Sequence, residues 1–108
     1  MSTAAATRVS PDEARRLLAA GPVTILDVRT PQEFTRLGHL PGARLLPVDL
    51  VAAALATLPD DGTPVLVCCE HGVRSAWAAD VLVTAGIGPV LDLAGGMAAW
   101  TGHREHGA

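Results

Sequence analysis

The chain has 108 residues, of which 49% are hydrophobic and 18% charged, and its formal net charge is −3. This length suits one domain over residues 1–108, and this composition excludes a disordered chain. All eight basic residues are arginine, they form no stripe, and only Trp77, Trp100 and Phe34 are aromatic, so we expect no nucleic-acid binding. No apolar run approaches the ~18 residues of a membrane span. We therefore expect no membrane contact and, without a leader-like start, a cytoplasmic location.

The first expected elements are a helix, a strand and a second helix. Ser10 is a favourable N-cap, a proline follows it, and Glu13 completes a capping box, so we predict a helix over residues 11–20. The β-branched apolar run at residues 23–28 predicts a buried strand. A second capping box predicts a short helix over residues 31–38.

The rest of the chain alternates short apolar runs with segments of helical pattern. The predicted strands are residues 43–46, 64–68 and 90–93, and the predicted helices are residues 50–58 capped by Asp49, residues 74–85 and residues 97–100. Such alternation indicates an α/β fold with a mostly parallel sheet and helices on both faces. We expect the core to span about residues 9–100, with short flexible N- and C-terminal tails.

The segment with the most chemical information follows the predicted strand 64–68, where ligands of a parallel sheet are expected to bind. A free thiol has a pKa near 8.5, so a nucleophilic cysteine needs surroundings that favour the thiolate. A turn between a strand and a helix can direct backbone N–H groups inward as an anion nest, and Gly72 permits the necessary backbone angles. Arg74 offers a permanent cation for an oxyanion, and His71 adds charge when protonated.

Three segments resemble the signatures of the rhodanese family in the order that the family has them. They are Cys69-x-x-Gly72-x-Arg74-Ser75, which resembles the active-site loop, the first signature over residues 27–43, and Gly95-Gly96-x-x-x-Trp100. The resemblance implies a central, mostly parallel five-stranded sheet. It also implies a single-domain sulfurtransferase in which Cys69 is catalytic and substrate is bound by Glu70, His71, Gly72, Val73, Arg74 and Ser75.

The resemblance further implies that Cys69 accepts a sulfane sulfur as a persulfide. The expected donors are thiosulfate or persulfides and the expected acceptors are thiols or cyanide, with a sulfur-donor or sulfur-acceptor protein as a further partner. Because the sulfur is carried covalently, no dissociable cofactor is expected. We also expect no metal, since Cys68, Cys69 and His71 include adjacent residues that chelate poorly.

Two other functions stay open from the sequence. One is a non-catalytic interaction or regulatory module with the same fold. The other is a phosphatase or arsenate reductase, whose Cys-x5-Arg loop appears only if the count starts at Cys68. We expect Cys68 instead to be a buried strand residue that points away from the loop, because neighbouring strand residues alternate faces.

The remaining polar residues carry weaker signals. Glu70 places a carboxylate beside the proposed nucleophile and would discourage anionic donors if it lay over the site. For Asp27, Arg29, Glu33 and His39, we prefer a structural polar network that ties the first predicted strand to the turn after it.

Overall fold

Within residues 5–107, which the computed structural model describes, the apolar runs form a five-stranded sheet. All neighbouring strands are parallel and their order is β1-β5-β4-β2-β3. The strands are β1 Thr7–Val9, β2 Thr24–Asp27, β3 Arg44–Leu45, β4 Val65–Cys68 and β5 Val90–Leu93. Because β4 is central, all four of its residues are buried. The predicted parallel α/β sheet is confirmed.

The three α-helices begin close to where the sequence predicts. They are α1 Pro11–Ala20, α2 Pro31–Leu37 and α3 Val73–Thr84. Both capping boxes form, since the caps Ser10 and Thr30 each accept a hydrogen bond from the backbone of Glu13 and Glu33 respectively. In the part of the chain from residue 5 to residue 107, no helix has both the length and the apolar character needed to cross a bilayer.

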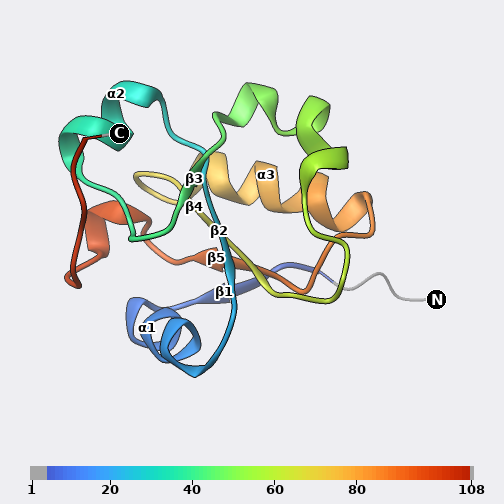
Figure 1. Cartoon of the computed structure of the whole chain (residues 1–108), viewed down its shortest axis with the longest axis horizontal. Coiled ribbons are helices and arrows are strands. Elements are labelled where there is room, and N and C mark those ends of the chain that lie inside the picture. Colours follow the sequence, from blue (N-terminus) through green and yellow to red (C-terminus); the bar gives the residue numbers. More distant parts are fainter. Residues whose placement is uncertain (1–4, 108) are drawn as a thin grey trace.

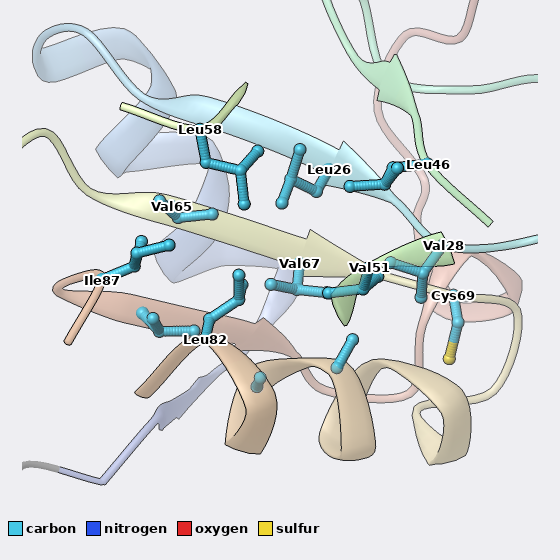
Figure 2. Close-up of a cluster of buried hydrophobic side chains, with 13 residues drawn as sticks. Leu26, Val28, Leu46, Val51, Leu58, Val65, Val67, Cys69, Leu82 and Ile87 are labelled. Carbon is cyan, nitrogen blue, oxygen red and sulfur yellow. The ribbon is translucent and has the colours of Figure 1, made fainter. Parts of the chain in front are cut away.

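Each face of the sheet carries its own hydrophobic cluster. Figure 1 shows α3 on one side of the sheet and α1 on the other, and Figure 2 shows the cluster on the α3 side. On one face, α3 contributes Ala78, Ala79 and Leu82, which pack on side chains of β2 and β4. On the other face, α1 contributes Ala14, and Trp100 packs nearby. The prediction of helices on both faces is confirmed.

The segment between β3 and β4 differs from the predicted helix. Two short 3₁₀ helices form there, η1 Val48–Leu50 and η2 Ala52–Thr57, and neither has a side-chain cap. Asp49 is exposed and does not cap a helix. Val51 and Leu58 are the buried contacts of this segment with the core. These buried contacts hold the segment against the core, but they are too few to require the regular turn of an α-helix.

The sequence did not predict β1, the edge strand that pairs with β5. Only Val9 of its three residues is buried, so the strand has too few apolar residues to produce a pattern. Its register places Arg8 beside Asp92. The strand therefore brings a cation to the site described below.

The C-terminal segment packs against the protein instead of lying free as we expected. His39 and Glu105 exchange two backbone hydrogen bonds of 2.8 and 2.9 Å, and Gly107 N–H donates to Thr35 at 3.1 Å. Arg104 donates to carbonyl groups of Leu37, Met97 and Trp100. These contacts are the physical reason for the difference. The expected tails also include residues 1–4 and 108, which lie outside the described residues.

Candidate active site

Cys69 lies in the first position after β4, in the loop that leads into α3 (Figure 2). Its sulfur accepts a hydrogen bond from the backbone N–H of Gly72 at 3.0 Å. Gly72 has φ 92°, a left-handed conformation that glycine adopts without strain, and it ends the loop as the N-cap of α3. Because only 1% of Cys69 is exposed, the sulfur lies at the base of the loop. The N–H group and the helix N-terminus both favour negative charge there.

The second polar neighbour of the sulfur is a side chain on the first turn of α3. Cys69 Sγ lies 3.3 Å from Ser75 Oγ, and Ser75 Oγ donates to Asp92 Oδ1 at 2.6 Å. Asp92 also forms an ion pair of 3.1 Å with Arg8. Sequence reasoning missed Asp92 and Arg8, although a carboxylate inside the apolar strand β5 was a usable signal, since such a group needs a buried partner.

The Gly95-Gly96 turn holds the loop from the other side. Met97 N–H donates to the Cys69 carbonyl at 2.7 Å, and Ala98 N–H donates to the Glu70 carbonyl at 3.0 Å. Gly96 has φ 65°, and a Cβ on this residue would lie 2.5 Å from the carbonyl oxygens of Cys69 and Glu70. The Gly95-Gly96 turn is therefore part of the wall that shapes the loop.

Glu70 faces a buried arginine, so its carboxylate is paired. Glu70 Oε1 accepts from Arg29 Nη1 at 2.9 Å, and Arg29 also binds Asp27 at 2.7 Å and the Gly38 carbonyl at 2.8 Å. Although burial alone would lower it, the pKa of Arg29 is raised, because Asp27 and then Glu70 stabilise the cation. The expected structural role of Asp27 and Arg29 is confirmed by these bonds. Glu70 therefore shares the single positive charge of Arg29 with Asp27.

Arg74 is engaged with α2 and its guanidinium is not directed at the sulfur. Its Nη1 and Nη2 bind the two carboxylate oxygens of Glu33 at 2.7 and 2.8 Å. This two-bond contact raises the pKa of Arg74 and, by the hydrogen bond from Arg74 above all, lowers the pKa of Glu33 to about 2. The pair fixes the first turn of α3 against α2. Donor binding by Arg74 stays a prediction.

Glu33→Gln is expected to lower the free energy of unfolding by about 1 kcal/mol at neutral pH, because the pair is partly exposed and solvent screens it. The folded pKa of Glu33, about 2, lies below its ordinary value of 4.5. The carboxylate therefore stabilises the fold above about pH 4.5, and this contribution is lost as the pH falls through about 2. Urea unfolding of the parent protein and of Glu33→Gln between about pH 7 and pH 3 should show that the difference in their free energies of unfolding becomes smaller as the pH falls.

Glu13→Gln is the matched control for this measurement. Glu13 occupies the same capping-box position in α1 but has no arginine bonded to its carboxylate in the part of the chain that is described. Glu13→Gln should therefore lower the free energy of unfolding by less than Glu33→Gln does. The stabilising role of the Arg74 pair would be contradicted if both variants lost the same free energy of unfolding. It would also be contradicted if the difference between the parent and Glu33→Gln did not change with pH.

Cys68 lies on the opposite face of the sheet from Cys69. It is fully buried in the cluster that packs on α1, and its sulfur lies 3.7 Å from the Leu26 carbonyl. Burial raises the pKa of the Cys68 thiol well above its ordinary value. A Cys-x5-Arg loop that starts at Cys68 is therefore not formed, and the phosphatase interpretation loses its nucleophile.

The other loop residues expected to bind substrate face solvent. His71 is exposed and Val73 is 77% exposed. The structure thus gathers Cys69, Gly72 and Ser75 around the sulfur, while the side chains of Glu70, His71, Val73 and Arg74 point elsewhere. In residues 5–107, no group of three or more His, Cys, Asp or Glu side chains could hold a metal ion.

Comparison with known proteins identifies the family. The family profile described as the rhodanese-like domain matches residues 10–103, so the chain belongs to the rhodanese-like family. It is 37% identical over 89 residues to a sulfurtransferase of Allochromatium vinosum, covering 82% of this chain and 81% of that protein. It is 36% identical over 97 residues to the thiosulfate sulfurtransferase GlpE of Pseudomonas paraeruginosa, covering 86% and 82%.

The fold agrees with a solved structure of the same family. A rhodanese-like domain protein from Staphylococcus aureus superposes with a TM-score of 0.84 at 32% identity, covering 94% of this chain and 99% of that one. The resemblance inferred from the three sequence signatures is confirmed.

Proposed function

We propose that this protein is a sulfurtransferase that carries sulfur as a persulfide on Cys69. The Cys69 thiolate attacks the outer sulfur of thiosulfate, forming one S–S bond while the bond to the sulfonate breaks and sulfite leaves with its electron pair. A thiol or cyanide then attacks the terminal sulfur, and the Cys69 thiolate is released. The second step forms an organic persulfide or thiocyanate, and the cycle involves no net oxidation of the protein.

The observation that carries this proposal is the placement of the Cys69 sulfur. It lies at the base of a loop between a parallel strand and a helix N-terminus, with the Gly72 N–H donating to it at 3.0 Å. Such surroundings favour the thiolate and can hold an anionic terminal sulfur. The relatives named as sulfurtransferases, one of them for thiosulfate, support the same activity.

The loop residues have distinct proposed roles in this reaction. The loop from Glu70 to Ser75 is proposed to bind substrate mainly through its backbone N–H groups, since the first N–H groups of a helix lack partners within it. Arg74, held by Glu33, positions the first turn of α3. Glu70 and Arg29 fix the start of the loop.

The surface beside the loop supports a protein as an additional donor or acceptor. Val73 is 77% exposed and Trp77 is 53% exposed, and with Val48 they border a hollow of about 360 Å³. Exposed apolar side chains beside a reactive group are typical of contact surfaces. Free cysteines at positions 68 and 69 suit a reducing compartment, which supports the proposed cytoplasmic location.

Intact mass spectrometry tests the proposal directly. After incubation with thiosulfate, the protein should gain the mass of one sulfur atom, and fragmentation should place that atom on Cys69. Cyanide should then remove it, because it attacks the terminal sulfur. A protein that gains no sulfur from thiosulfate or from an organic persulfide would favour the non-catalytic interaction module instead.

A further inference from the structure

A chain of polar side chains connects the Cys69 sulfur to the protein surface. It runs from Cys69 Sγ to Ser75 Oγ at 3.3 Å, from Ser75 Oγ to Asp92 Oδ1 at 2.6 Å, and from Asp92 Oδ2 to Arg8 at 3.1 Å. Ser75 is fully buried, and the side chain of Asp92 is 6% exposed, whereas that of Arg8 is 57% exposed. These polar side chains come from α3, β5 and β1, so the fold brings them together and no single local segment does.

The direction of each hydrogen bond in this chain follows from the proton count. An ionised carboxylate only accepts, so the single proton of the Ser75 hydroxyl points to Asp92. Ser75 Oγ then presents only lone pairs to the sulfur, and the contact at 3.3 Å is a hydrogen bond only if Cys69 is a thiol that donates its proton. While Ser75 donates to Asp92, the Ser75 contact can therefore be made by a thiol and not by a thiolate.

We propose that Asp92 is a positioning residue that controls, through the Ser75 hydroxyl, whether Cys69 is protonated. The inference rests on the proposed function of Cys69. In the resting protein, Ser75 donates to Asp92 and accepts from the thiol. When the thiol proton leaves to a base in solution, the Ser75 hydroxyl rotates and donates to the sulfur. The bonds from the thiol to Ser75 and from Ser75 to Asp92 break and one bond from Ser75 to the sulfur forms, while Asp92 keeps Arg8.

Other charged and titratable groups near the sulfur are the same in every variant used to test this proposal. Their side chains come from several elements, and the charged ones are paired with each other or exposed. They are Asp27 at the end of β2, Arg29 after β2, Glu33 on α2, Glu70 and His71 in the loop, and Arg74 on α3, while Cys68 on β4 is replaced by alanine in every variant. A change caused by Asp92 can therefore be separated from their constant contribution.

The thiolate absorbance of the protein, followed against pH, measures the protonation of Cys69. The chain has no tyrosine, so no tyrosinate band interferes. A Cys68→Ala background leaves one thiol. In this background Asp92→Asn is expected to lower the midpoint pH of the Cys69 titration by about one unit. The new amide can donate to Ser75, which frees the Ser75 hydroxyl proton for the sulfur.

Two further variants separate a relay through Ser75 from a direct effect of charge. Ser75→Ala and the double variant Ser75→Ala with Asp92→Asn are expected to share one midpoint, because no hydroxyl remains to transmit the change. Arg8→Gln, at the exposed end of this series of polar side chains, is expected to raise the midpoint pH. Without its ion pair to Arg8, Asp92 holds the Ser75 hydroxyl proton more strongly. Asp80→Asn, an exposed residue on the same helix, is the matched control and should leave the midpoint unchanged.

An unchanged or raised midpoint in Asp92→Asn would overturn the proposal. So would a double variant shifted from Ser75→Ala as far as Asp92→Asn is shifted from its parent, because Asp92 would then act through space. The titration needs no sulfur donor. A protein that gains sulfur in the mass measurement but shows no shift in Asp92→Asn loses this inference alone, whereas one that gains no sulfur loses the proposed function.

Discussion

Replacing Cys69 with alanine is expected to abolish thiocyanate formation from thiosulfate and cyanide, leaving the rate without protein. No other atom at the base of the loop can form the S–S bond, so the loss should appear in kcat and not as a higher KM. Cys68→Ala is the matched control, because it removes the neighbouring thiol on the opposite face of the sheet. It should retain most of the activity.

The two variants need a measurement of stability beside the assay. Cys68 is fully buried, so its truncation is expected to cost about 1 kcal/mol or more in the free energy of unfolding. Activities are therefore compared at a temperature where both variants are folded. Activity that survives in Cys69→Ala and disappears in Cys68→Ala would reverse the assignment of the nucleophile.

The parts of the fold that the sequence predicts well are those fixed by neighbouring residues. The capping boxes at Ser10 and Thr30 predict the starts of α1 and α2, because the cap and its partner are three residues apart and act locally. The apolar run of β4 likewise predicts a central strand, since a strand buried on both faces has no polar positions. The position of Cys69 in the loop follows from these elements.

The contacts that the sequence does not predict join residues far apart in the chain. Arg74 and Glu33 are 41 residues apart, and Arg8 and Asp92 are 84 apart. Local patterns carry no information on which arginine meets which carboxylate, because this depends on the order of strands in the sheet. For this reason neither the pair of Arg74 with Glu33 nor the contact of Ser75 with Asp92 had a counterpart among the predictions.

Arg29→Met is expected to produce the largest loss of stability among the variants considered, about 3–5 kcal/mol in the free energy of unfolding. The side chains of Arg29 and Asp27 are both 0% exposed, and the guanidinium binds two oxygens of Asp27, the Gly38 carbonyl and Glu70. Methionine fills much of the volume but leaves the Asp27 carboxylate buried without its cation. Denaturant unfolding measures the loss.

The double variant Asp27→Leu with Arg29→Met decides whether the loss comes from the unpaired charge. With both charges removed, no fully buried ion is left without a partner, since Glu70 is partly exposed and solvent can reach its carboxylate. The double variant should therefore be more stable than Arg29→Met alone. Arg36→Met, which truncates an exposed arginine on α2, is the matched control and should change stability little. A double variant no more stable than Arg29→Met would show that the bonds to Gly38 and Glu70, and not the buried carboxylate, account for the effect. In that case Arg29 would stabilise the fold chiefly by holding the start of the Cys69 loop.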